Sequence, residues 1–358
     1  MKKHLILVIL ICFLVGCGGQ SVPGETTVAT MPPVEHPVGI CLPDEANPYW
    51  AACGALLQEE LAAIGYETTI SYCNNDAQVQ AQQVEELYSK NVSCLILGAI
   101  DSVGLEKVLA DYQTAGIPVV ALDRMVMDAA CVEVCISFDY RAIGETMGRY
   151  VETELALATA AQTGRSHTVE FLMGSPDDPN ALAIHQGLIG VLQPYLSSGV
   201  LTCPSGRTSF EDTWVLREDS EKAGENLTRY IQRHYEENTY PQIVFASSDL
   251  LAQGCIQALQ ALECPVTQWP IITGQGWQTQ DVTQQRQAMT VQKNTRQLVT
   301  DCVGAVQMLL TYGQLSQDFA QSTADNHARS VPMRYCGFEM IAHSQEQTES
   351  EEMQEPLQ

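Results

Sequence analysis

The chain has 358 residues, of which 45% are hydrophobic, enough to build two cores of ordinary domain size. It carries 18 lysines and arginines against 43 aspartates and glutamates. This acidity argues against nucleic acid as a partner, because phosphate binding needs a basic surface. A neutral polar ligand fits the charge best, although an acidic surface would also simply keep the protein soluble.

The first residues combine a basic start, Met1-Lys2-Lys3, with an apolar run over residues 5–15 that is too short to span a bilayer. The run ends in Leu14-Val15-Gly16-Cys17, which resembles the processing site of bacterial lipoproteins. The resemblance implies that residues 1–16 are a signal peptide and that Cys17 carries lipid. The mature protein would then be anchored to the cell membrane outside the cytoplasm, in the periplasm or on the outer face. An ordinary secretory signal with a chance cysteine is the alternative.

Residues 17–37 are polar and contain Thr, Pro and Gly, which predicts a flexible tether. Beyond it, apolar runs typical of buried strands alternate with segments of helical periodicity. The strands expected first are Val38–Leu42, Glu67–Tyr72, Cys94–Leu97, Ile117–Leu122 and Val134–Phe138, and the helices are Asn47–Ile64, Ala77–Lys90 and Val103–Ala115. Such β-α units predict a parallel sheet with helices on both faces.

The same alternation resumes after residue 138. The expected strands are Thr168–Met173, Val200–Pro204, Ile243–Ala246, Pro270–Thr273, Thr290–Lys293 and Pro332–Ile341, and the helices are Ile143–Leu157, Ala181–Leu192, Glu218–Tyr235, Leu250–Leu262 and Thr295–Tyr312. The sequence therefore predicts an α/β fold of two doubly wound parallel-sheet lobes.

The first lobe is expected to comprise residues 38–138 and 293–330, and the second lobe residues 139–292 and 331–343. Three crossings would join them, near Ser137–Tyr140, Gln292–Asn294 and Ser330–Met333. Residues 344–358 are rich in Glu and Gln, which predicts a disordered acidic tail.

Of the 13 cysteines, 11 follow Cys17, an odd number that does not complete a disulfide framework. Apolar surroundings, as at Cys41 and Cys94, favour buried free thiols, although a pair between Cys131 and Cys135 remains open. No spacing of cysteine and histidine indicates zinc, and we expect neither a metal nor a cofactor.

In doubly wound sheets, ligands bind beyond the carboxyl ends of the strands. The candidate binding residues near such ends are Tyr49, Trp50, Asp123, Arg124, Asn180, Trp214, Ser248, Asp249, Gln275 and Lys293. Aromatic rings can cover the apolar faces of a sugar ring, and ionic and amide groups can bind its hydroxyls. The set predicts a sugar-binding cleft between the lobes.

Most of the candidates also have a structural alternative. Tyr49 and Trp50 could belong to the core of the first helix, Asp123-Arg124 could form a structural ion pair, and Trp214 could serve packing. Asn180, Ser248 and Asp249 precede or begin helices and could cap them, while Asp177-Asp178 favour a turn and a cap over a ligand contact.

The chain resembles the type I periplasmic sugar-binding proteins, the substrate-capturing components of ABC importers, and most closely their multiple-sugar and xylose-binding branch. The stretches that carry the resemblance are Val38–Trp50, Leu95–Asp101, Val119–Arg124, Gly174–Gly187, Phe245–Gly254, Ile272–Gln275 and Val291–Leu298. The resemblance implies stacking roles for Tyr49, Trp50 and Trp214. It also implies that Asp123, Arg124, Asn180 and Lys293 bind the oxygens of a sugar.

The resemblance further implies a hinged binder, which we expect to be a monomer, that captures a monosaccharide, delivers it to an ABC permease and performs no catalysis. The chain departs from the family at Gly276, where an acidic residue is common, and at Ser248, where Asn or Tyr is common. Three alternatives remain open: a sensor that signals to a membrane receptor, an enzyme of carbohydrate metabolism, and a binder of a non-sugar polar ligand such as a polyol or a nucleoside.

Overall fold

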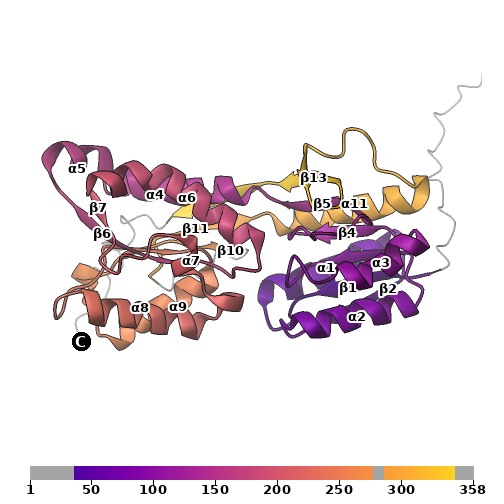
Figure 1. Ribbon diagram of the computed structural model, residues 1–358, viewed down its shortest axis with the longest axis horizontal. Coiled ribbons are helices and arrows are strands. Elements are labelled where there is room, and N and C mark those ends of the chain that lie inside the picture. The colour runs from indigo at the N-terminus through magenta and orange to yellow at the C-terminus, as the bar shows by residue number, and fades with distance from the viewer. Residues whose placement is uncertain (1–35, 277–285, 343–358) are drawn as a thin grey trace, which may run out of the picture. The chain divides into compact units, whose positions relative to one another are not determined.

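The computed structural model describes residues 36–276 and 286–342, which form two lobes built on parallel-stranded sheets (Figure 1). The expected signal peptide, Cys17, most of the tether and the acidic tail lie outside the described residues. Within the described ranges, no helix combines the length and apolar character needed to cross a membrane.

The first lobe is built on a seven-stranded sheet with the order β12-β13-β5-β4-β3-β1-β2. Its strands are β1 (Val38–Leu42), β2 (Thr68–Tyr72), β3 (Cys94–Leu97), β4 (Val119–Leu122), β5 (Val132–Phe138), β12 (Ser322–Asp325) and β13 (Ser330–Cys336). Ile40 lies opposite both Ile70 and Ile96 in parallel register, and β12 alone in this sheet runs antiparallel to its neighbour. The apolar runs of the sequence thus become strands buried between helices.

Among the described residues, four helices cover this sheet. They are α1 (Pro48–Ala63), α2 (Ala77–Ser89), α3 (Glu106–Ala115) and α11 (Thr295–Tyr312). Helix α1 packs against α11, and α2 packs against α3 over a core that includes Val84, Leu87 and Tyr112. Helices on both faces leave the strand ends as the exposed edge at which a ligand can bind.

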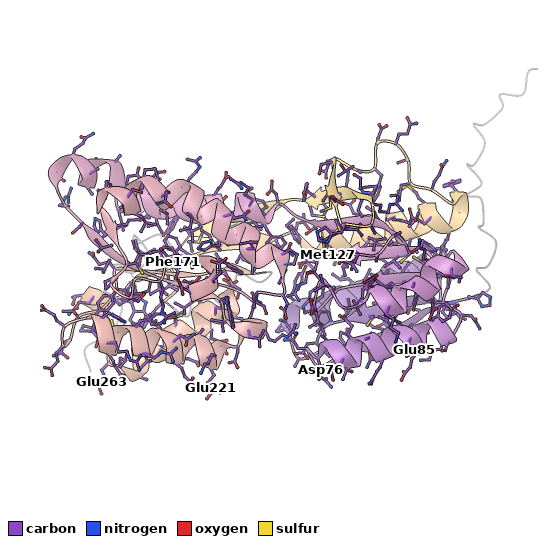
Figure 2. All side chains as sticks on the ribbon, viewed as in Figure 1. Asp76, Glu85, Met127, Phe171, Glu221 and Glu263 are labelled. Carbon is purple, nitrogen blue, oxygen red and sulfur yellow. The ribbon has the colours of Figure 1, made fainter. Side chains whose placement is uncertain are left out.

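The second lobe contains a four-stranded sheet of order β7-β6-β8-β9 and a three-stranded sheet of order β10-β11-β14. Its strands are β6 (His167–Leu172), β7 (Leu201–Thr202), β8 (Ile243–Ala246), β9 (Ile271–Ile272), β10 (Gln275–Gly276), β11 (Met289–Lys293) and β14 (Phe338–Ala342). A backbone hydrogen bond from Ala288 N to Ile272 O (3.0 Å) joins the two sheets. Inside the core, the ring of Phe171 (Figure 2) stacks on that of Phe245 with centroids 5.5 Å apart.

The helices of the second lobe are α4 (Tyr140–Glu154), α5 (Leu157–Thr163), α6 (Pro179–Ser198), α7 (Phe210–Thr213), α8 (Ser220–His234) and α9 (Asp249–Ala261), with short turns η1 (Leu216–Glu218) and η2 (Val266–Gln268). Helices α4 and α6 pack together, and α8 and α9 form a second pair whose apolar faces share one core. The two pairs cover opposite sides of the sheets (Figure 1).

The last apolar run differs from the prediction. We expected one strand, Pro332–Ile341, in the second lobe, but β13 pairs with β5 in the first lobe and β14 pairs with β11 in the second. The third crossing is therefore at Gly337 and not near Ser330–Met333, and residues 331–336 belong to the first lobe. Alternation along a strand shows which side chains are buried but not which sheet buries them. Asn294 N donates to Gly337 O (3.0 Å), which ties two crossings together.

Several helix boundaries also differ from the prediction. The helix expected from Val103 begins at Glu106, and the helix expected over Ile143–Leu157 divides at Ala156, whose φ is +44°. The helix expected from Glu218 begins at Ser220, because Asp219 caps it by accepting a hydrogen bond from Lys222 N. The last shift leaves Glu218 outside the helix.

All the cysteines in the described ranges are free thiols, so the pair that spacing left open between Cys131 and Cys135 is not formed. Burial disfavours the charged thiolate and raises the pKa of Cys94 to about 12 and that of Cys131 to about 11. These thiols act as small apolar core residues, as the sequence predicted.

Candidate functional site

The strand ends of both lobes border one cavity of about 560 Å³, a size typical of small-molecule sites. Nine of the ten candidate residues line it: Tyr49, Trp50, Asp123, Arg124, Asn180, Ser248, Asp249, Gln275 and Lys293. The tenth, Trp214, does not.

The aromatic wall comes from the first turn of α1. Asn47 caps this helix by accepting a hydrogen bond from Tyr49 N (3.0 Å), and Pro48 occupies the first helical position. The following rings of Tyr49 and Trp50 are 9% and 3% exposed and meet edge to face with centroids 4.9 Å apart. Both rings therefore belong to the core and line the cavity at once, so the structural alternative holds and the binding role stays a prediction.

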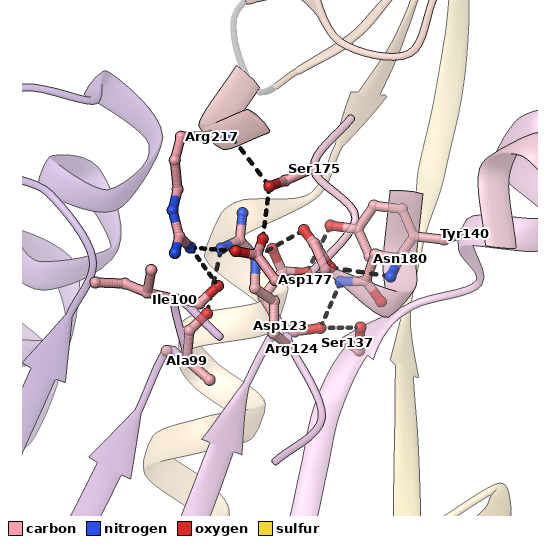
Figure 3. A network of polar contacts seen from close by, with 12 residues as sticks. Ala99, Ile100, Asp123, Arg124, Ser137, Tyr140, Ser175, Asp177, Asn180 and Arg217 are labelled. Atoms are coloured by element: carbon pink, nitrogen blue, oxygen red, sulfur yellow. Dashed lines mark hydrogen bonds and ion pairs between the residues drawn. The ribbon is translucent and has the colours of Figure 1, made fainter. Parts of the chain in front are cut away.

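Asp123 occupies a sharp turn directly after β4. Its φ is +67°, and Arg124 N donates to Leu122 O (2.8 Å), the hydrogen bond of a γ-turn. Left-handed backbone at a non-glycine residue costs on the order of 1–3 kcal/mol and persists where neighbours hold it. The neighbours here are Ser137 and Asn180, whose side chains both donate to the carbonyl of Asp123 (Figure 3).

The carboxylate of Asp123 also has a partner, since the Tyr140 hydroxyl donates to Oδ1 at 2.6 Å. Lys293 Nζ lies 3.1 Å from the same hydroxyl and 4.1 Å from the centroid of the Tyr49 ring. Burial, reinforced by the charge of Asp123, raises the pKa of Tyr140 well above its usual value, so the phenol keeps its proton. Tyr140 and Lys293 lie at two of the crossings between the lobes and thus join the crossings to the cavity.

Arg124 and Asp178 form an ion pair, with Nε 2.8 Å from Oδ2. Asp178 caps α6 through its other oxygen, which accepts from Asn180 N (2.9 Å), so Asn180 is not the cap and its side chain is left to bind Asp123. Burial raises the pKa of Asp178, while Arg124 lowers it. Burial alone would lower the pKa of Arg124, but Asp178 and Glu218 raise it above its ordinary value.

A second arginine spans the lobes beside the first. Arg217 Nη1 lies 2.8 Å from Asp177 Oδ2 and donates to Ile100 O (3.2 Å), while Arg124 Nη1 donates to Ala99 O (3.2 Å). Figure 3 shows both guanidinium groups directed at this Ala99–Ile100 loop of the first lobe. The structural alternative of an Asp123–Arg124 ion pair is not observed, because Arg124 pairs with Asp178 of the second lobe.

Ser248 and Asp249 begin α9. Ser248 caps the helix, as the structural alternative held, since its hydroxyl accepts from Leu251 N (3.4 Å). Asp249 accepts from Gln287 Nε2 (2.7 Å) and Thr290 Oγ1 (2.8 Å). Both residues also line the cavity.

Asp249 explains the glycine at position 276. A Cβ added to Gly276 would lie 2.1 Å from Asp249 Oδ2, closer than atoms can approach. The acidic group that the family resemblance places at residue 276 has no room here, because the Asp249 carboxylate fills that space.

Gln275 contributes an unpaired polar atom. The side chain is buried, and its Oε1 has no hydrogen-bond partner among the described residues. A buried acceptor without a donor costs about 1–3 kcal/mol, which a ligand hydroxyl could relieve.

Sequence reasoning missed several cavity-lining residues, among them Tyr140, Asp178, Arg217 and Glu218. Tyr140 and Asp178 were assigned only to a crossing and a cap, and Glu218 to the first position of a helix. Asp219 followed by Ser-Glu is a helix-start signal that would have left Glu218 in the preceding loop.

The placement predicted for Trp214 is wrong. The residue is 41% exposed and borders a neighbouring surface depression with Arg207, Asp212 and Tyr230. Trp214 and Val215 are both extended, so their side chains point to opposite sides. Val215 is buried in the core, which turns Trp214 outward.

The described residues contain no cluster of three or more His, Cys, Asp or Glu side chains that could hold a metal ion. The lining instead combines rings, carboxylates, guanidinium groups and amides. Such a set can hydrogen-bond a polar ligand at many points and cover its apolar faces.

Known proteins are similar to this chain in sequence and in fold. It is 30% identical over 320 residues to the multiple sugar-binding periplasmic protein of Azospirillum brasilense, covering 88% of each chain. It is 28% identical to the D-xylose-binding periplasmic protein of Escherichia coli, covering 84% of each. Among solved structures, an ABC transporter solute-binding protein from Clostridium phytofermentans with bound β-D-glucose matches with a TM-score of 0.80 and 29% identity, covering 88% of this chain and 95% of that one.

The family model described as a periplasmic binding protein domain matches residues 38–314, which include most of both lobes and the nine cavity-lining candidates. The type I fold expected from the sequence is confirmed by this match and by the solved structures. The chain belongs to the periplasmic binding protein family.

Proposed function

We propose that this protein is an extracytoplasmic solute-binding lipoprotein that captures a monosaccharide in the cavity between its lobes and delivers it to an ABC permease. The observation that carries the proposal is the cavity itself, where Tyr49 and Trp50 lie beside Asp123, Arg124 and Asn180. Aromatic faces next to fixed donors and acceptors suit a ring that has apolar faces and a rim of hydroxyls.

The relatives support the sugar class. Two of them are named for binding multiple sugars or D-xylose, and a matching structure holds β-D-glucose. These relatives bind solutes, and we propose that this chain likewise releases its ligand unchanged. We expect it to act as a monomer.

The crossings support closure around a ligand. Lys293 and Tyr140 connect two crossings to Asp123, so a sugar that contacts Asp123 would affect the groups at which the lobes turn. A ligand stabilises the closed state only through its greater affinity for that state.

Anchoring rests on the Leu14-Val15-Gly16-Cys17 sequence, which lies outside the described residues. Lipid on Cys17 would hold the mature protein at the membrane, where its permease lies. Metabolic labelling with a fatty acid tests this step: wild type should incorporate the label and Cys17→Ala should not.

A thermal-shift screen over monosaccharides, polyols and nucleosides tests the ligand class. A ligand present at 100 times its Kd stabilises the folded state by about 2.7 kcal/mol, enough to raise the Tm by several degrees. At least one monosaccharide should shift the Tm, and NMR should find it unaltered after incubation. A shift with nucleosides or polyols alone would refute the sugar class, and chemical conversion of the sugar would refute a pure binding role.

A further inference from the structure

Glu218 is a cavity-lining carboxylate that no comparison assigns. It follows Arg217 in the turn before α8, and the φ values are +58° for Arg217 and +53° for Glu218. Two consecutive left-handed non-glycine residues cost on the order of 1–3 kcal/mol each and persist only where the surroundings fix them. Such strain is commonly found where a side chain must be presented to a ligand.

The surroundings do fix this turn. Arg217 N donates to Ser175 Oγ (3.0 Å), and the Arg217 side chain binds Asp177 and the carbonyl of Ile100. Glu218 N donates to Val215 O (3.2 Å). The Glu218 carboxylate then lies beside Gly174, where an added Cβ would be only 3.2 Å from its Oε1.

The cavity carries more negative than positive groups. Among the described lining residues, six are acidic (Asp44, Asp123, Asp178, Glu218, Asp219 and Asp249) and three are basic (Arg124, Arg217 and Lys293). Each of the three cations already has a protein partner: Asp178 for Arg124, Asp177 for Arg217, and the Tyr140 hydroxyl with the Tyr49 ring for Lys293.

The Glu218 carboxylate lies among both opposite and like charges. Arg124 and Lys293 act on it favourably and the Ser248 hydroxyl donates to it, but Asp178 opposes its charge. Burial, ahead of these partners, raises the pKa of Glu218. A ligand carboxylate or phosphate placed nearby would add a further like charge in a site of low dielectric, where repulsion is strong.

We propose that Glu218 is a specificity-determining residue that makes the cavity accept neutral aldoses and reject their anionic derivatives. This inference rests on the proposed sugar-binding function. The Glu218 carboxylate accepts hydrogen bonds from the hydroxyls of a neutral sugar and repels a carboxylate at the same position.

Isothermal titration with matched probes tests the proposal. The probes are D-glucose and D-galactose, their hexuronates, and the corresponding hexuronamides, which have nearly the shape of the hexuronates without the charge. Wild type should bind a neutral sugar. It should bind the hexuronamide more weakly, because the amide group is bulkier than the hydroxymethyl group it replaces. It should bind the hexuronate at least ten times more weakly than the hexuronamide.

Glu218→Gln should reduce the ratio of the hexuronate Kd to the hexuronamide Kd about tenfold. Glu218→Asp keeps the charge and should retain most of that ratio. The matched control is Glu221→Gln, because Glu221 is exposed on α8 (Figure 2) and does not line the cavity. An unchanged ratio in Glu218→Gln, or an equal change in Glu221→Gln, would overturn the role of Glu218.

Two other outcomes separate this inference from the proposed function. Tight binding of the hexuronates by wild type would overturn the selectivity and leave sugar binding intact. Failure of every sugar in the preceding screen to shift the Tm would refute sugar binding, and the selectivity with it.

Discussion

Arg124 of the first lobe and Asp178 of the second lobe meet at 2.8 Å inside the ligand cavity. The same aspartate caps α6, and the same guanidinium lies 5.5 Å from the centroid of the Trp50 ring. One ion pair therefore links a helix terminus, an aromatic wall and both lobes. A ligand that contacts either member also acts on the contact between the lobes.

Replacing Arg124 should show how much this ion pair contributes to the free energy of unfolding. Arg124→Ala leaves the buried Asp178 carboxylate without its cation, and losing one member of a buried pair typically costs about 3–5 kcal/mol. We expect a lower free energy of unfolding, measured by urea denaturation. The double variant Arg124→Ala/Asp178→Asn should lose less free energy of unfolding than the two single variants lose together, because neither charge is then left without a partner.

The pH dependence of Arg124→Ala follows from the pKa of Asp178. Burial raises this pKa above its unfolded value, so folding takes up a proton and stability falls as the pH rises from the unfolded pKa through the folded pKa. Without Arg124 the folded pKa rises further. The deficit of Arg124→Ala relative to wild type should therefore be smaller at pH 5 than at pH 8, and an equal deficit at both would contradict the assignment.

Asp123 and Trp214 should differ sharply in their effect on binding. Asp123→Asn keeps an acceptor for Tyr140 but removes the charge, and charge-assisted hydrogen bonds contribute about 1.5–3 kcal/mol. We expect at least tenfold weaker sugar binding by isothermal titration. Trp214→Ala should change the Kd less than twofold, because this ring lies outside the cavity. A large loss in Trp214→Ala would restore the stacking role that the sequence suggested.

The alternation of apolar runs was enough to predict the α/β class and most strands, because burial on both faces of a parallel sheet leaves a strong signal. Val38–Leu42, Cys94–Leu97 and Ile243–Ala246 have the same bounds in the structure. Pairing could not be predicted in the same way. The final apolar run divides between two sheets at Gly337, and nothing in its side-chain pattern distinguishes their edges.

The site was predictable where strand ends mark it, as at Asp123 and Lys293, since sheet topology brings such ends together. It was less predictable in loops. Trp214 is turned outward by a two-residue alternation with Val215, and Glu218 enters the cavity through left-handed backbone. Both depend on local dihedral angles that residue type determines weakly.

Replacing Gln275 should affect stability and ligand binding in opposite directions. Its Oε1 is buried without a partner among the described residues, so Gln275→Met removes an unpaired acceptor while conserving side-chain length. We expect the ligand-free protein to be equally stable or up to about 1 kcal/mol more stable. Sugar binding should weaken by about tenfold, as measured by titration. A less stable variant with unchanged affinity would show that Gln275 serves the fold and not the ligand.

Gly276 and Asp249 should be energetically coupled. Gly276→Ala would place a Cβ 2.1 Å from Asp249 Oδ2, an oxygen of a carboxylate that Gln287 and Thr290 hold in place. Overpacking of this kind costs about 1–3 kcal/mol, so the Tm should fall and sugar binding should weaken. In an Asp249→Ala background the added methyl group has room, and Gly276→Ala should cost much less there.

A matched control is Gly304→Ala in α11, where an added Cβ meets no atom within 4 Å and should be neutral or stabilising. Equal costs of Gly276→Ala in both backgrounds would mean that the Asp249 carboxylate does not limit the space beside residue 276.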